Sequence, residues 1–151
     1  MNRSLELVIY EIAGHRVGIC VFAVARVVHA VEITALPEAP EIVMGVINVE
    51  GRVVPVINVR RRFHFPEREV DPADFFVLAR TSHREVALPV DLVIGVDACS
   101  AADVTGSDEI LPGLNFIEGV VRREDGLILI HDLEKFLSFD EEESLERLVK
   151  A

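Results

Sequence analysis

The sequence has few cysteines and no long apolar run. Although 50% of its 151 residues are apolar, no stretch reaches the roughly 18 uninterrupted apolar residues that cross a bilayer. Charged residues such as Arg3, Glu6 and Glu11 interrupt its beginning, so we expect a soluble protein without a secretory signal. Cys20 and Cys99 are too few for a disulfide framework, which predicts two buried free thiols in a reducing, cytoplasmic compartment.

The sequence also lacks an excess of basic residues. Its 15 basic and 26 acidic residues give a formal net charge of −11. Such a charge repels a phosphate backbone and removes the counterion release that drives nucleic-acid binding, so we expect no nucleic-acid partner. The basic run at 60–62 is interpreted as a solvated helical turn or, alternatively, as a contact for an acidic partner surface.

Motifs for catalysis, metal binding or cofactor binding are missing. None of the five histidines lies three or four residues from another, which is the spacing of a metal site on a helix. There is no nucleophile elbow, phosphate loop or dinucleotide fingerprint. We therefore predict a non-catalytic protein without metal or cofactor. Two alternatives stay open: an enzyme site assembled from distant segments, such as His131 with Asp91, and a barrel that binds a small molecule.

Short segments rich in β-branched residues alternate with turn residues along most of the chain. This pattern is typical of strands joined in hairpins. The predicted hairpins pair 5–12 with 17–28, 46–49 with 53–59, 75–79 with 85–96, and 116–122 with 127–131. Regular spacing of this kind favours a barrel or a sandwich.

Helical patterns are confined to the end of each half of the chain. Short turns are predicted at 60–65 and 132–137, and Leu145, Leu148 and Val149 form one apolar face of a terminal helix. Because the two halves share this layout, we predict one all-β domain with two barrel lobes. Its expected parts are lobe 1 at about 14–66, a connector at 66–74, lobe 2 at about 1–13 plus 74–138, and a C-terminal amphipathic helix at 139–151.

One central segment matches a known pattern. Residues 36–65 read LPEAPEIVMGVINVEGRVVPVINVRRRFHF. The matching positions are Pro37, Pro40, Gly45, Val46, Asn48, Gly51, Val54, Pro55, Val56, Arg60, Arg62 and Phe63. This segment resembles the P-x-x-P, G-V-x-N-L-R-G and V-V-P-V-x-D-L-R-x-R-F pattern of the CheW family of chemotaxis coupling proteins. The resemblance continues at 17–28, 88–93 and 119–137, and so covers almost the whole chain.

The resemblance implies two SH3-like, five-stranded β-barrel lobes in a cytoplasmic adaptor. Such an adaptor couples methyl-accepting chemoreceptors to a CheA-type histidine kinase, without catalysis and without inserting into the membrane. In the family, the cytoplasmic tip of the receptor lies in the apolar groove between the lobes, and the regulatory domain of the kinase docks at the barrel ends. The apolar Val21, Val24 and Val90, and the polar Asn48 and Asn58, are accordingly predicted to bind partners.

Three positions depart from the family pattern in charge. The arginine of N-L-R-G is Glu50 here, the glutamate of an earlier V-x-E element is Arg26, and Asn58 replaces the aspartate of D-L-R. We hypothesise that Arg26 and Glu50 contact each other with reversed polarity and bind partners; the alternative is two independent surface substitutions. The reversal leaves open a paralogue that serves another chemosensory array, controlling twitching, gliding or a second messenger.

Overall fold

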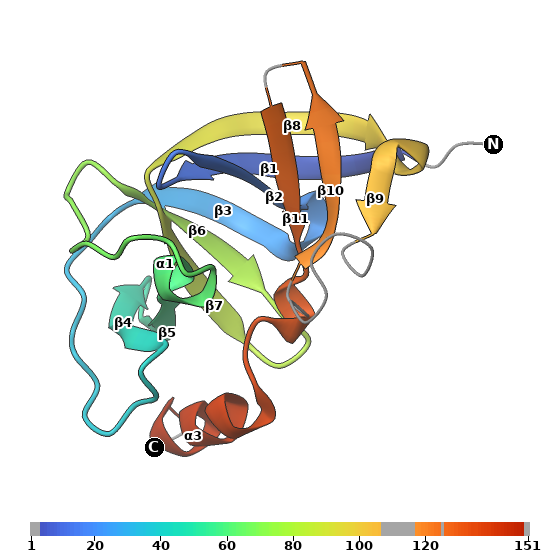
Figure 1. Ribbon diagram of the computed structural model, residues 1–151. Coiled ribbons are helices and arrows are strands. Elements are labelled where there is room, and N and C mark those ends of the chain that lie inside the picture. The colour runs from blue at the N-terminus through green and yellow to red at the C-terminus, as the bar shows by residue number, and fades with distance from the viewer. Residues whose placement is uncertain (1–3, 107–116, 125, 150–151) are drawn as a thin grey trace.

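The structure is a computed structural model that describes residues 4–106, 117–124 and 126–149 (Figure 1). Its strands form two sheets. From edge to edge, the six-stranded sheet contains β8 (Leu92–Ser100), β1 (Ser4–Ile12), β2 (His15–Cys20), β11 (Gly126–His131), β10 (Ile117–Arg123) and β9 (Val104–Gly106). The five-stranded sheet contains β3 (Val24–His29), β6 (Phe75–Arg80), β7 (Glu85–Val90), β5 (Arg52–Ile57) and β4 (Val43–Val49). The predicted all-β fold with two barrel-like lobes is confirmed, and the short β9 gives one sheet a sixth strand.

The chain crosses between the sheets at two places that the sequence pattern does not reveal. A 3-10 turn, η1 (Val21–Ala23), separates β2 from β3, and Asp91 separates β7 from β8. The predicted strands 17–28 and 85–96 are therefore each divided between the two sheets. The reason is that β-branched composition continues through both crossings, so that nothing in the residue types marks a break.

These crossings also divide the chain differently from the predicted lobe boundaries. Strand β2 belongs to the same sheet as β1, whereas the prediction places 14–66 in lobe 1 and 1–13 in lobe 2. Strands β6 and β7 join β3, β4 and β5 in one sheet, whereas the prediction places 74–138 in lobe 2. Hairpin patterns identify which neighbouring strands pair but not which sheet a hairpin extends, and this explains the difference.

The turn between β4 and β5 has the backbone of a tight two-residue reversal. Glu50 and Gly51 have φ values of 50° and 87°, and they connect the paired residues Val49 and Arg52. Positive φ at both positions is typical of a type I′ turn, which suits the twist of a hairpin and requires the freedom of glycine at the second position. The predicted hairpins at 46–59 and 116–131 are both confirmed.

The edge of the five-stranded sheet is closed by the segment that follows β3. Thr34 forms an isolated bridge with Val46 of β4, with N···O distances of 2.9 and 2.8 Å. Gly45 makes this approach possible, because a Cβ atom there would lie 2.3 Å from the carbonyl oxygen of Thr34. The bridge joins the loop after one edge strand to the other edge strand, so the sheet becomes barrel-like.

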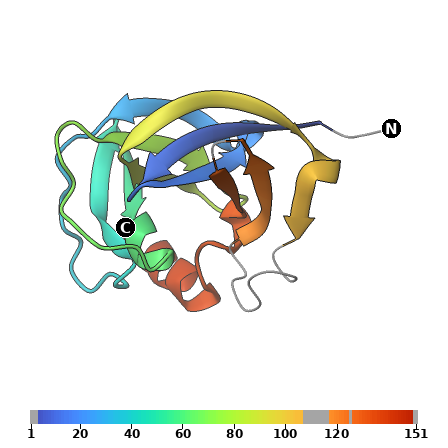
Figure 2. The same cartoon turned by 45° about the horizontal axis from the view of Figure 1, so that its top comes forward.

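The terminal helix packs against the strands as expected. Helix α3 (Phe139–Val149) buries Leu145 completely, and Glu141 pairs with Arg62 of the short helix α1 (Val59–Arg62) at 2.6 Å. Figure 2 shows β8 and β1 arching over one side of the molecule while α1 and α3 lie on the opposite side. The other predicted turn, at 132–137, is η3 (Leu133–Lys135). Among the described helices, none has the length and apolar character needed to span a bilayer.

Candidate partner-binding surface

A chain of ion pairs crosses the outer surface of the five-stranded lobe. Arg26 of β3 lies 3.0 Å from Glu50, which is 3.9 Å from Arg52. Arg52 also donates to both carboxylate oxygens of Glu85, at 3.1 and 3.4 Å. The predicted contact between Arg26 and Glu50 is therefore confirmed. It joins opposite edges of the sheet, because β3 and the β4–β5 turn lie at its two ends.

The exposure of this pair limits what it contributes to the fold. The side chains of Arg26 and Glu50 are 44% and 65% exposed, and such pairs stabilise a protein by only about 0 to 1 kcal/mol. Glu50 also holds a left-handed backbone conformation, which is unfavourable for a residue other than glycine, asparagine or aspartate. Neither property favours stability as the main role of the pair, and the exposure of both side chains leaves their charges accessible to a partner.

The two predicted asparagines have clear local roles. The Oδ1 atom of Asn48 accepts a hydrogen bond from the N–H of Gly51 at 2.8 Å, which stabilises the β4–β5 turn. Asn58 caps α1 by accepting from the N–H of Arg61 at 3.0 Å, and its side-chain amide donates to Glu67 at 2.8 Å. Asn48 is exposed and Asn58 is partly exposed, so both remain reachable by a partner.

The three predicted apolar residues lie in different environments. Val21 and Val24, at the crossing between the sheets, are partly exposed. Val90 is 1% exposed and belongs to the main core, so its placement on a binding surface is corrected: β7 is an interior strand with both faces covered. Sequence reasoning missed Phe22, which is 90% exposed between Val21 and Ala23. Alternation from the buried Val17 and Ile19 would have placed it on the outer face.

Strand β8 carries a second apolar surface that sequence reasoning missed. Leu92, Ile94 and Val96 alternate along this edge strand and are 49%, 48% and 63% exposed. Because the residues between them are also small or apolar, the alternation does not reveal which set faces water. Exposed apolar side chains at a sheet edge are typical of a protein-binding surface.

Asp91 connects the two lobes where the chain passes from β7 to β8. Its carboxylate accepts a hydrogen bond from the N–H of Ala13 in the β1–β2 turn, at 3.0 Å. It also binds the guanidinium groups of Arg60, at 2.8 and 2.9 Å, and of Arg68, at 2.8 Å. Ala13 follows a strand of the six-stranded sheet, whereas Arg60 belongs to α1 after the five-stranded sheet. Asp91 therefore helps to fix the relative orientation of the lobes.

A neighbouring ion pair anchors the connector between β5 and β6. Arg68 donates to both carboxylate oxygens of Asp74, at 2.8 and 2.9 Å. Burial of this carboxyl group raises its pKa, but the hydrogen bonds from Arg68 and from the N–H of Asp71 outweigh that effect, and the net pKa of Asp74 is lowered. The carboxylate therefore stays ionised at neutral pH. The basic run at 60–62 likewise pairs internally, with Asp91, Glu41, Glu67 and Glu141.

The described residues do not bring together the groups proposed for an enzyme. His131 lies among Phe63 and Phe136, with ring centroids 5.4 and 4.1 Å away, and neither of its ring nitrogens has a hydrogen-bond partner. Burial lowers the pKa of His131 to about 3. Asp91 instead binds arginines, so the two residues form no acid–base pair. In 4–106, 117–124 and 126–149, no three His, Cys, Asp or Glu residues are grouped to hold a metal ion.

Comparisons with known proteins agree on one family. The model of the CheW-like domain family matches residues 6–141. The chain is 26% identical to the chemotaxis protein CheW of Treponema pallidum, over 97% of this chain and 90% of that protein. It is 26% identical to the chemotaxis protein CheW of Rhizobium meliloti, over 95% and 94%. The crystal structure of the scaffolding protein TtCheW from Thermoanaerobacter tengcongensis superposes with a TM-score of 0.82 at 26% identity, covering 92% of this chain and 91% of that one.

Proposed function

Because the chain belongs to the family of CheW-like domain proteins, it is a chemotaxis coupling adaptor, and we propose that it joins a chemoreceptor to a CheA-type histidine kinase. The observation that carries this proposal is the extent of the likeness: the family match covers 6–141, and the fold follows that of a scaffolding protein along nearly its whole length. An adaptor works by contact, which suits a molecule whose accessible features are apolar side chains and ion pairs.

The proposed partners are the cytoplasmic tip of a methyl-accepting chemoreceptor and the regulatory domain of the kinase. Val21, Val24, Asn48 and Asn58 remain candidates for these contacts, together with the Arg26 and Glu50 pair. What supports this is accessibility: these side chains are partly or fully exposed at the crossing, at the β4–β5 turn and, for Asn58, at the start of α1. The exposed apolar residues of β8 extend the candidate surface.

The adaptor is proposed to act in the cytoplasm and without catalysis. A reducing compartment suits the two free thiols, of which Cys99 is buried as predicted and Cys20 is exposed, contrary to the prediction. Within the described residues, the ring nitrogens of His131 have no hydrogen-bond partner, which supports a non-catalytic role.

Co-purification tests the proposal directly. The full chain carrying an affinity tag is mixed with the receptor cytoplasmic fragment and the kinase encoded in the same genome, and each is expected to be retained separately. The control is a receptor fragment that lacks its membrane-distal tip, which is expected not to be retained. Absence of both interactions under conditions where the chain is folded would exclude the adaptor role.

A second candidate follows from the reversed ion pair. Arg26 and Glu50 carry charges opposite to the family pattern, which favours a paralogue serving another chemosensory array, such as one for twitching, gliding or second-messenger control. Testing retention by kinases from each array of one organism distinguishes the candidates. Preferential retention by a kinase of a non-chemotaxis array would support the second.

A further inference from the structure

A cleft of about 610 Å³ lies on the five-stranded lobe, between residues 30–35 after β3 and residues 69–72 before β6. We call it the acidic-rimmed cleft. Its apolar lining includes Val31, Ile33, Met44 and Val70. Val31 is 51% exposed and the other three are partly exposed. Apolar side chains that line an open cleft of this size are typical of a binding site.

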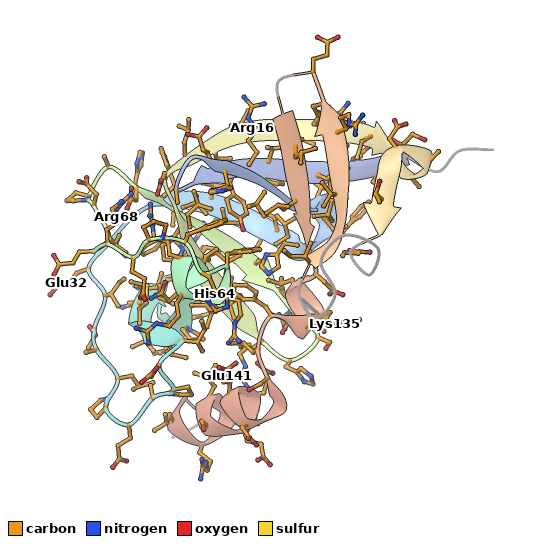
Figure 3. All side chains as sticks on the ribbon, viewed as in Figure 1. Arg16, Glu32, His64, Arg68, Lys135 and Glu141 are labelled. Carbon is orange, nitrogen blue, oxygen red and sulfur yellow. The ribbon has the colours of Figure 1, made fainter. Side chains whose placement is uncertain are left out.

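The rim of the cleft is negatively charged. Glu32, Glu69 and Asp71 lie along it, and none of its lining residues is Lys, Arg or His. In the described part of the chain, neither Glu32 nor Glu69 forms an ion pair through its side chain. Figure 3 shows Arg68 on the same side of the molecule as Glu32, but its guanidinium group is held by Asp74 and Asp91. In the described part of the chain, the carboxylates of Glu32 and Glu69 are therefore not paired with a cation, whereas Asp71 accepts a hydrogen bond from the N–H of Ala73 at 2.8 Å.

We propose that the acidic-rimmed cleft binds a short cationic segment of a partner protein. An aliphatic side chain of that segment enters the cleft, and flanking Lys or Arg side chains pair with Glu32 and Glu69. Charge complementarity selects this occupant, because a rim with three carboxylates in a chain of net charge −11 repels acidic peptides and nucleic acid.

A second copy of the chain does not fit the cleft as well. The most concentrated basic run of the chain, at 60–62, already pairs internally with Asp91, Glu41, Glu67 and Glu141. Two copies would also bring together surfaces of the same negative sign. The inference goes beyond coupling of receptor and kinase, because it concerns neither the ion pair of Arg26 with Glu50 nor the apolar edge of β8. It can therefore fail while the adaptor role stands.

Fluorescence anisotropy of the full chain with labelled hexapeptides tests the proposal. The probe has two leucines flanked on each side by two arginines; one control peptide replaces the leucines with glycine, and another replaces the arginines with glutamate. We expect the probe to bind, and both control peptides to bind at least several-fold more weakly. The double change Glu32→Gln with Glu69→Gln is expected to weaken probe binding about three- to tenfold, because each exposed pair contributes little.

A matched variant separates this site from general electrostatic attraction. The double change Glu118→Gln with Glu143→Gln removes the same charge from exposed positions on β10 and α3, and it is expected to leave probe binding within twofold. Equal weakening by both double variants would overturn the proposal, as would equal binding of the leucine and glycine peptides. Sedimentation that shows a dimer dissociated by Glu32→Gln with Glu69→Gln would instead assign the cleft to a second copy.

Discussion

In the five-stranded lobe the backbone closes the barrel, whereas in the six-stranded lobe a side chain does so. Thr34 bridges to Val46 through two backbone hydrogen bonds. On the other lobe, the guanidinium group of Arg123 in β10 donates to the carbonyl oxygen of Ala98 in β8 at 3.1 Å and pairs with Asp97 at 2.9 Å. Each lobe thus has an arginine and an acid joining strands that are not neighbours in its sheet order, but only one of the two pairs also binds the backbone.

This difference indicates where the sign of a charge is free to vary. Arg26 and Glu50 add an exposed ion pair to a barrel that is already closed by backbone hydrogen bonds. Reversing the two charges keeps the attraction, so selection for a partner can set the polarity. Arg123 must donate to a carbonyl oxygen, which a carboxylate cannot do. The pair in the six-stranded lobe is therefore fixed in polarity by the fold.

The largest effect is expected where the lobes meet, at Asp91. The change Asp91→Asn removes the charge that Arg60 and Arg68 share, and Arg60 is only 13% exposed. Leaving such a cation without its carboxylate is expected to lower the free energy of unfolding by about 2 to 4 kcal/mol, measured by urea denaturation. The control Asp97→Asn, whose side chain is 51% exposed, is expected to cost less than about 1 kcal/mol. An equal loss of unfolding free energy in the two variants would contradict the proposed role of Asp91 in holding the two lobes together.

His131 is expected to make the stability of the protein depend on pH. Because burial lowers its pKa to about 3 while an unfolded histidine titrates near 6.5, the unfolded state binds the proton more tightly between these values. Stability is therefore fully present above about pH 6.5 and falls as the pH drops towards 3, by at most about 1.4 kcal/mol per pH unit. Urea denaturation at several pH values measures this slope.

Two variants test whether His131 causes this pH dependence of stability. The change His131→Phe is expected to flatten the pH dependence between about 6.5 and 5, because the titrating group is absent. The change His83→Gln, at an exposed turn between β6 and β7, is expected to leave the slope as it is. An unchanged slope in His131→Phe would show that carboxylates such as Asp74, rather than the histidine, cause the loss of stability in acid.

Replacing the arginine by uncharged glutamine is expected to destabilise the protein more in the Arg123 pair than in the Arg26 pair. Arg123→Gln removes both the ion pair and the bond to the Ala98 carbonyl, and should lower the free energy of unfolding by about 1 to 2 kcal/mol. Arg26→Gln removes only an exposed ion pair and should cost less than about 1 kcal/mol. Hydrogen exchange checks the location: amides of β8 should exchange faster in the first variant, while those of β4 stay protected in the second. A reversed order of the two losses would refute the comparison.

The sequence allowed prediction of features that depend on local residue types. Hairpins at 46–59 and 116–131 and the helix at the C-terminus follow from turn residues and apolar spacing. The lobe boundaries could not be placed, because β2 and β3 form one β-branched run that changes sheet at η1. Sheet membership depends on contacts between distant segments, such as the parallel pairing of β2 with β11.

The candidate surface was predictable only where a pattern departed from expectation. The contact between Arg26 and Glu50 could be proposed because both positions carry unexpected charges in a recognisable segment. The β8 residues and Asp91 carry no such signal: an exposed valine and a buried one, such as Val96 and Val90, are the same residue type in the sequence. Burial is decided by which sheet covers which face, and this needs the whole fold.

The smallest effect on stability, and the most informative effect on binding, is expected from exchanging the charges of the reversed pair. Arg26→Glu with Glu50→Arg should lower the free energy of unfolding by no more than about 1 kcal/mol, because the exposed pair is restored with exchanged charges while the exposed contact of position 50 with Arg52 becomes one between like charges. Each single change places like charges together and should weaken retention of the cognate partner in co-purification. If the partner recognises the sign of each charge, the double variant still retains the partner weakly although the pair is restored. If only the geometry of the lobe matters, the double variant recovers full retention. We expect the first result, because the Thr34 bridge closes the lobe whichever way the charges point.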